Sequence, residues 1–105
     1  MMQDVVDALA AHGQTVLTAT RGKTLLRGVK QFIETLGLLP DNPATELSAE
    51  SFEMITALEE QVIERLERWI ETEDDRFSPE LAQSVYAIRR SAEKIYLWRR
   101  HYLQS

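Results

Sequence analysis

The sequence has no cysteine, and only four glycines and three prolines among its 105 residues. Without cysteine it cannot form disulfides, a thiolate nucleophile or a thiolate-based zinc site. Glycine and proline most often interrupt regular structure, so their scarcity favours few, long elements. No apolar run approaches the roughly 18 residues of a membrane span, and the first seven residues lack the features of a secretory signal. We therefore expect a cytoplasmic protein that does not bind a membrane.

A general excess of positive charge is also missing. The chain has a net charge of −5 and an isoelectric point near 5.0, whereas nucleic-acid-binding domains usually carry a basic surface. The charges are segregated along the chain. Residues 1–45 are neutral overall, residues 46–80 carry −9, and residues 81–105 carry +4. The last two segments are therefore oppositely charged neighbours.

Apolar residues recur every three or four positions through most of the chain, which is the spacing of amphipathic helices. Strand-like alternation and internal repeats of 20–50 residues are missing from the sequence. A chain of this length supports one hydrophobic core. We therefore predict an all-α fold in which residues 1–105 form a single domain. The expected form is a four-helix up-and-down bundle, with a short N-terminal helical hairpin packed on a long C-terminal one. The predicted helices span residues 3–18, 23–36, 49–73 and 79–103.

Helix lengths predict an interaction surface. Helices three and four would each be about 37 Å long at 1.5 Å per residue, whereas the first two reach only about 21–24 Å. The short hairpin should then leave the tip of the long hairpin uncovered, and an apolar patch of that size usually marks an interface. We expect a protein partner, such as a second copy in a homodimer, to cover this tip. The predicted interface residues are Leu66, Trp69, Ile70, Phe77, Leu81, Val85 and Ile88.

Arg99 interrupts the apolar stripe of the fourth helix, which runs from Leu81 to Tyr102 in steps of three and four. One interpretation is that Arg99 lies near a frayed helix end and extends its guanidinium to water. The other is a structural ion pair with Glu59, which falls on the apolar face of the third helix. Such a pair would fix the register of the long hairpin more than it would stabilise it.

A second face of the fourth helix carries four residues suited to binding. It could be an ordinary solvated face, or it could hold an acidic peptide or single-stranded nucleic acid, because cations and tryptophan bind both. The acidic charge elsewhere favours the peptide. The candidate basic face consists of Arg90, Lys94, Trp98 and His101.

The sequence offers no candidate catalytic, cofactor or metal residues. Gly22-Lys23-Thr24 resembles the end of a phosphate-binding loop, but Leu17 occupies the position where the full pattern needs glycine. An enzyme with carboxylates inside the bundle would need several acids on buried stripes, and Glu59 alone qualifies. The leading hypothesis is a non-enzymatic protein-interaction module, a homodimeric adaptor or regulator acting through the long hairpin. The alternative is a nucleic-acid-associated regulator that uses the basic face.

Overall fold

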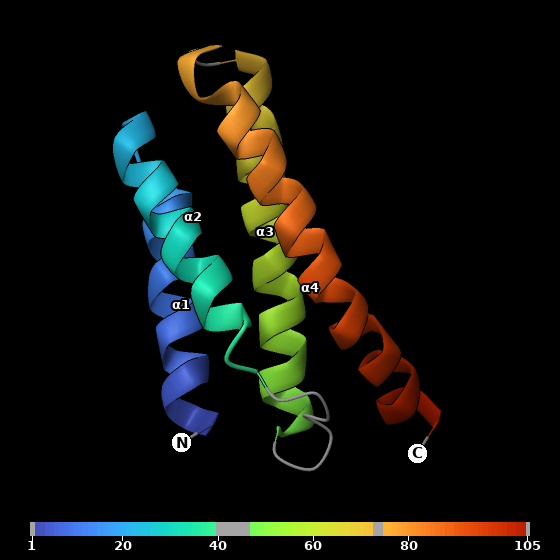
Figure 1. Ribbon diagram of the computed structural model, residues 1–105. Helices are drawn as coiled ribbons and strands as arrows, with labels where there is room; N and C mark the ends of the chain where they lie inside the picture. The colour runs from blue at the N-terminus through green and yellow to red at the C-terminus, as the bar shows by residue number, and fades with distance from the viewer. Residues whose placement is uncertain (1, 40–46, 73–74, 105) are drawn as a thin grey trace.

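The structure is a computed structural model that describes residues 2–39, 47–72 and 75–104, with the backbone alone at residue 75 and over 92–104 (Figure 1). All regular elements in these ranges are helical, which confirms the all-α prediction. Each α-helix begins and ends within one residue of its predicted boundary. The elements are α1 (Met2–Thr18), α2 (Gly22–Leu36), α3 (Ala49–Thr72), the 3-10 helix η2 (Asp75–Phe77) and α4 (Ser78–Gln104).

Helices α2 and α3 begin in different ways. At the start of α3 the Ser48 hydroxyl accepts a hydrogen bond from the Ser51 amide at 3.1 Å, as a serine N-cap does. At the start of α2 the residue in the cap position is Arg21, whose side chain makes no capping hydrogen bond. The first turn of α2 is therefore stabilised by its packing rather than by a local cap.

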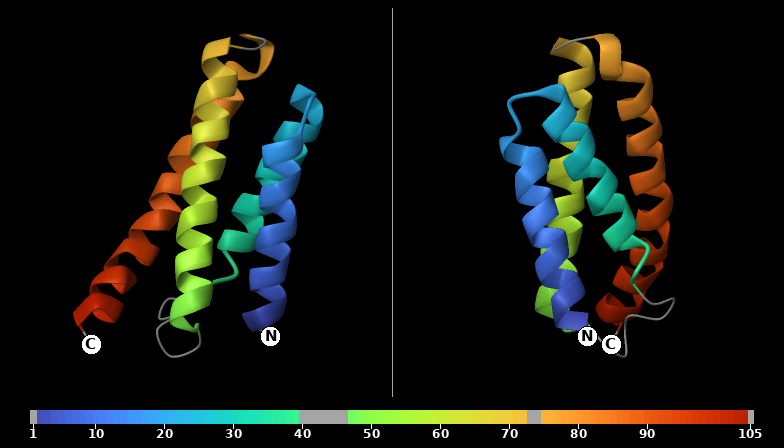
Figure 2. Two further views of the ribbon diagram at one scale, coloured as in Figure 1. Left: turned by 180° about the vertical axis from the view of Figure 1, so that it is seen from behind. Right: turned by 60° about the vertical axis from the view of Figure 1, so that its left-hand side comes forward.

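Each α-helix runs antiparallel to the next one along the chain, but the order around the bundle is not the order in sequence (Figures 1 and 2). Helix α1 packs against α2 and α3, and α4 packs against α3 and α2. The circuit is thus α1, α2, α4, α3, which makes α1 parallel to α3 and α2 parallel to α4. In the simplest up-and-down bundle α2 and α3 would be neighbours, whereas here they lie across a diagonal.

The short hairpin lies next to the tip of the long one, which corrects the expected placement. The Arg65 guanidinium donates a hydrogen bond of 2.7 Å to the carbonyl of Ala19, in the turn between α1 and α2. Beside this turn, a Cβ added to Gly22 would collide with the Phe77 ring, so α2 begins directly against η2. At the opposite end of the bundle, where the short hairpin does not reach, Leu39 and Leu47 are buried and extend the core.

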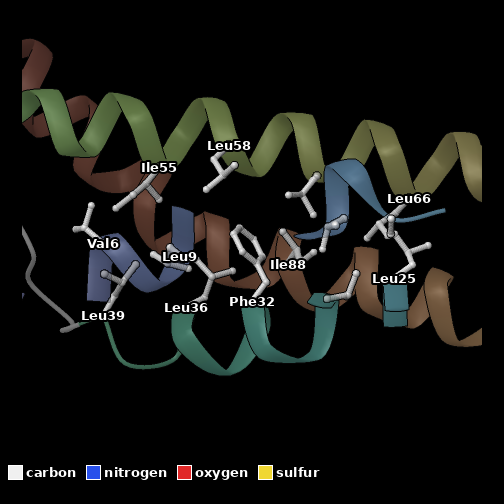
Figure 3. Close-up of a cluster of buried hydrophobic side chains, with 14 of the residues drawn as sticks. Val6, Leu9, Leu25, Phe32, Leu36, Leu39, Ile55, Leu58, Leu66 and Ile88 are labelled. Atoms are coloured by element: carbon white, nitrogen blue, oxygen red, sulfur yellow. The ribbon is translucent and has the colours of Figure 1, made fainter. Parts of the chain in front are cut away.

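This offset buries most of the predicted interface inside the chain itself (Figure 3). Leu66, Leu81 and Ile88 are fully buried, and Trp69 is 5% exposed. The expectation that the short hairpin leaves them uncovered is therefore wrong for these four residues. The remaining three residues of the predicted interface are half-buried and pack against the core: Ile70, Phe77 and Val85.

The core runs along the whole interior between the two hairpins. Its members recur at helical spacing on the inward faces, and burying each large apolar side chain contributes about 1.5–3 kcal/mol. Helix α1 approaches α3 closely at Gly13, since a Cβ there would lie 2.6 Å from a methyl carbon of Leu58 and would displace that side chain. Over the described residues, no helix combines the length and apolarity needed to cross a membrane. The largest fully buried side chains are Phe32, Leu9, Leu25, Ile55, Leu66, Leu81, Ile88, Val16, Val29 and Val62.

Arg65 is expected to contribute more to stability than other arginines of α3. Its guanidinium also lies over the Trp69 ring, with Cζ 4.9 Å from the ring centroid. Arg65→Met keeps most of the apolar stem but leaves the Ala19 carbonyl without its donor. We expect the free energy of unfolding, measured by urea denaturation, to fall by about 1–3 kcal/mol.

Arg68→Met is the matched control, because Arg68 is exposed one turn further along the same helix. We expect this control to change stability by less than about 0.5 kcal/mol. Equal losses in the two variants would contradict a specific role for the Arg65 contact.

Candidate functional site

A groove with a volume of about 680 Å³ lies between the parallel helices α2 and α4. Its floor is apolar, formed by half-buried Leu26 and Ile33 from α2 and Ala87 from α4. The polar lining is mostly exposed and stands along the two edges. These edge residues are Arg27, Lys30 and Glu34 on α2, and Glu80, Gln83 and Ser84 on α4.

The position of the groove follows from the offset between the two hairpins. Because α2 starts beside η2, its residues 26–34 run alongside residues 80–87 at the beginning of α4. Helices α2 and α4 run in the same direction (Figure 1). Arg27 and Glu80, each near the start of its lining, therefore lie at the same end of the groove. The charged edge is balanced, with two bases and two acids.

A smaller hollow of about 300 Å³ lies between α1 and α3. It is lined by Leu17 from α1 and by Gln61, Glu64, Arg65 and Arg68 from α3, so the Arg65 contact closes one side of it. Its single apolar residue gives it little to bind a peptide. We therefore treat it as a product of helix packing rather than as a site.

The predicted basic face is described in part. Arg90 is exposed, and its Cζ lies 5.9 Å from the centroid of the Tyr86 ring, which belongs to a residue that is itself 65% exposed. Lys94, Trp98 and His101 belong to the stretch of α4 in which the structure describes the backbone alone. The structure thus adds one aromatic residue, Tyr86, next to the described member of this face.

Glu59 is the one charged side chain in the described core. It is 3% exposed, and its Oε1 has no hydrogen-bond partner among the described atoms. Burial raises the pKa of Glu59 from its usual value of 4.5 to about 8, and the adjacent charge of Glu60 acts in the same direction. With a pKa of about 8 the Glu59 carboxyl would be mostly protonated at neutral pH, whereas an ion pair with Arg99 would require it to be ionised.

The hypothetical partner of Glu59, Arg99, has its side chain outside the described residues, so the ion pair stays a prediction. The backbone register is compatible with it. An exposed salt bridge joins Glu67 of α3 to Arg89 of α4. Glu59 lies eight residues before Glu67 on α3, and Arg99 lies ten residues after Arg89 on α4, so the two positions are at similar distances from this bridge along the antiparallel helices.

Metal binding finds no support in the side chains that the structure describes, since no three histidines or carboxylates among them are grouped to hold an ion. Sequence reasoning misses the groove between α2 and α4. A signal for it exists as a second apolar position beside the buried stripe of α2, where Leu26 and Ile33 flank Leu25 and Phe32. Which helix stands beside those positions depends on the order around the bundle, which periodicity does not encode.

Stability should fall with rising pH because of Glu59. The pKa is higher in the folded chain than in the unfolded one, so the contribution of Glu59 is fully present below pH 4.5 and is lost as pH rises through about 8. The full pKa difference corresponds to a loss of at most about 5 kcal/mol. We expect Glu59→Gln to remove this dependence, measured by urea denaturation between pH 5 and pH 9.

Glu53→Gln, an exposed substitution on the same helix, should retain the pH dependence of the original chain. An ion pair with Arg99 predicts the opposite behaviour, because a paired carboxylate stays ionised and favours the folded state at neutral pH. Stability that does not fall between pH 5 and pH 9, together with destabilisation by Arg99→Met, would therefore support the pair.

The comparisons with known proteins give no further assignment. No protein-family model matches the sequence, and neither the curated proteins nor the solved structures show a significant similarity to it. The functional interpretation therefore depends on the groove between α2 and α4 and on the residues that line it.

Proposed function

We propose that this chain is a non-enzymatic protein-interaction module whose binding surface is the groove between α2 and α4. The observation that carries the proposal is the combination of an apolar floor with charged edges. Binding grooves for peptides and helices share this composition, since apolar contact supplies affinity and the charges select the partner.

The shape of the groove favours an α-helix as the bound segment. Residues 26–34 of α2 cover about 12 Å along the helix axis, a little more than two turns. An amphipathic helix presents apolar side chains at spacings of three and four, which match the rows contributed by Leu26, Ile33 and Ala87. Polar residues flanking those positions would meet the exposed edges.

In this proposal the long hairpin contributes one wall of the binding surface, the side of α4 rather than the tip that the sequence suggests, and α2 of the short hairpin contributes the other wall. Ile33 and Ala87 are only half-buried, whereas four of the predicted tip residues are buried in the core. An adaptor or regulator acting in the cytoplasm fits a cysteine-free chain with a binding groove.

The alternative is a nucleic-acid-associated regulator acting through Arg90, Lys94, Trp98 and His101. The exposed pair of Arg90 and Tyr86 favours it, because bases stack on aromatic rings and guanidinium planes. Against it stands the balanced charge of the adjacent groove. Anisotropy of a labelled single-stranded oligonucleotide would separate the two, since nucleic-acid binding weakens steeply as salt rises.

Photocrosslinking tests the proposed binding surface and identifies the partner in the same experiment. A photoreactive phenylalanine analogue replaces Lys30, at the edge of the groove, or Glu60, which is exposed on α3. Irradiation of the chain in the cells that express it should give a discrete polypeptide adduct at position 30 and none at position 60. The masses of the adducts, read by mass spectrometry, identify what was bound.

Ile33→Asp should abolish the adduct because it places a charge on the apolar floor. Ile63→Asp is the matched control, a half-buried isoleucine on α3 that does not line the groove. Circular dichroism should show that both variants keep their helices, and Ala87→Asp provides a second groove variant if Ile33→Asp unfolds. An adduct at position 60 as strong as at position 30 would rule out the groove as the binding surface.

A further inference from the structure

We propose that the groove is covered by the same face of a second copy of this chain, which makes the module a two-fold symmetric homodimer. This inference depends on the proposed function and names the partner for the same groove. In the dimer, α2 of each copy packs against α4 of the other. The signs and positions of the charges at the groove edges support this partner.

The groove is matched to a partner that carries both signs of charge. Its α2 edge begins with two bases, Arg27 and Lys30, whereas its α4 edge begins with an acid, Glu80, followed by uncharged Gln83 and Ser84. A polyanion would be repelled by Glu80, and a strongly basic peptide by Arg27 and Lys30. A second copy supplies the same basic and acidic edges, so each edge can meet its opposite.

Two face-to-face arrangements of the groove have two-fold symmetry. With the axis perpendicular to the helices, α2 of one copy would lie antiparallel to α2 of the other. Lys30, near the middle of the lining, would then face Lys30 of the second copy. With the axis parallel to the helices, α2 of one copy faces α4 of the other at the same height. The second arrangement avoids the like-charged contact at the axis.

The parallel axis also pairs the charged ends. Arg27 and Glu80 both line the groove at its starting end, and α2 and α4 run in the same direction (Figure 1). Exchange by the two-fold axis therefore brings Arg27 of each copy to Glu80 of the other, and Lys30 to the uncharged Gln83. The half-buried Leu26, Ile33 and Ala87 of the two copies then face one another across the interface, between these pairs.

Charge exchange tests this geometry. Arg27→Glu and Glu80→Arg, each prepared alone, give a homodimer with like charges at both symmetric positions. We expect each to dissociate at least about tenfold more readily than the original chain, since the changed pair occurs twice. Mixing the two variants should restore the dimer, because each introduced glutamate then faces an introduced arginine in the other copy. Sedimentation equilibrium at low salt measures the dissociation constants.

The mixture makes the test specific to contacts between copies. If each substitution broke a bond within its own chain, both variants would dimerise more weakly, but mixing them could not restore the dimer. A mixture of Arg27→Glu with Glu34→Arg provides the matched control, because those positions meet in the antiparallel arrangement. Glu34→Arg should dimerise by itself, and mixing should not return Arg27→Glu to the affinity of the original chain. Full rescue in that mixture would overturn the proposed axis.

Two further outcomes separate this inference from the proposed function. A chain that stays monomeric at high concentration, while position 30 crosslinks a different polypeptide, would overturn the homodimer and leave the groove as a binding surface. A dimer unaffected by either charge reversal would show association through another face, which also overturns the inference. Absence of any adduct at position 30 would remove both proposals together.

Discussion

The hydrogen bond from Arg65 to the carbonyl of Ala19 fixes how the two hairpins sit against each other. It joins the last third of α3 to the turn between α1 and α2, 46 residues apart in sequence. The guanidinium also lies over Trp69, which keeps it oriented, and the neighbouring contact of Gly22 with Phe77 holds the same offset. Arginine suits this position because it places a fixed charge beside the carbonyl end of α1, where the helix dipole is negative.

The offset between the hairpins also determines which apolar surface stays accessible. Because α2 begins beside η2, it covers the first half of α4, and the valley between these two parallel helices becomes the groove. At the opposite end of the bundle, the core is covered by Leu39 and Leu47, which flank the connection from α2 to α3. The core and the candidate site are therefore two results of the same displacement of one hairpin along the other.

The helices and their ends could be predicted from the sequence because their causes are local: the apolar period of three and four, and the serine cap at Ser48. Burial of Glu59 followed from its place on an apolar stripe, for the same reason. The offset could not be predicted, because it depends on long-range contacts: the bond from Arg65 to Ala19 and the approach of Gly22 to Phe77. In the sequence, Arg65 occupies what looks like an ordinary polar position. The groove depends on this offset and on the order of the helices around the bundle. The sequence therefore could not predict which helices form its walls, or that Arg27 and Glu80 line the same groove.

The missing side-chain cap at Arg21 has a consequence for how the chain reaches its folded state. Neither end of the turn between α1 and α2 is completed by its own hairpin: the carbonyl at Ala19 takes its donor from α3, and the start of α2 takes its packing from Phe77. An excised short hairpin would accordingly fray at the end where it should be tightest. We therefore expect the two hairpins to fold as one cooperative unit, despite the local character of most of their contacts.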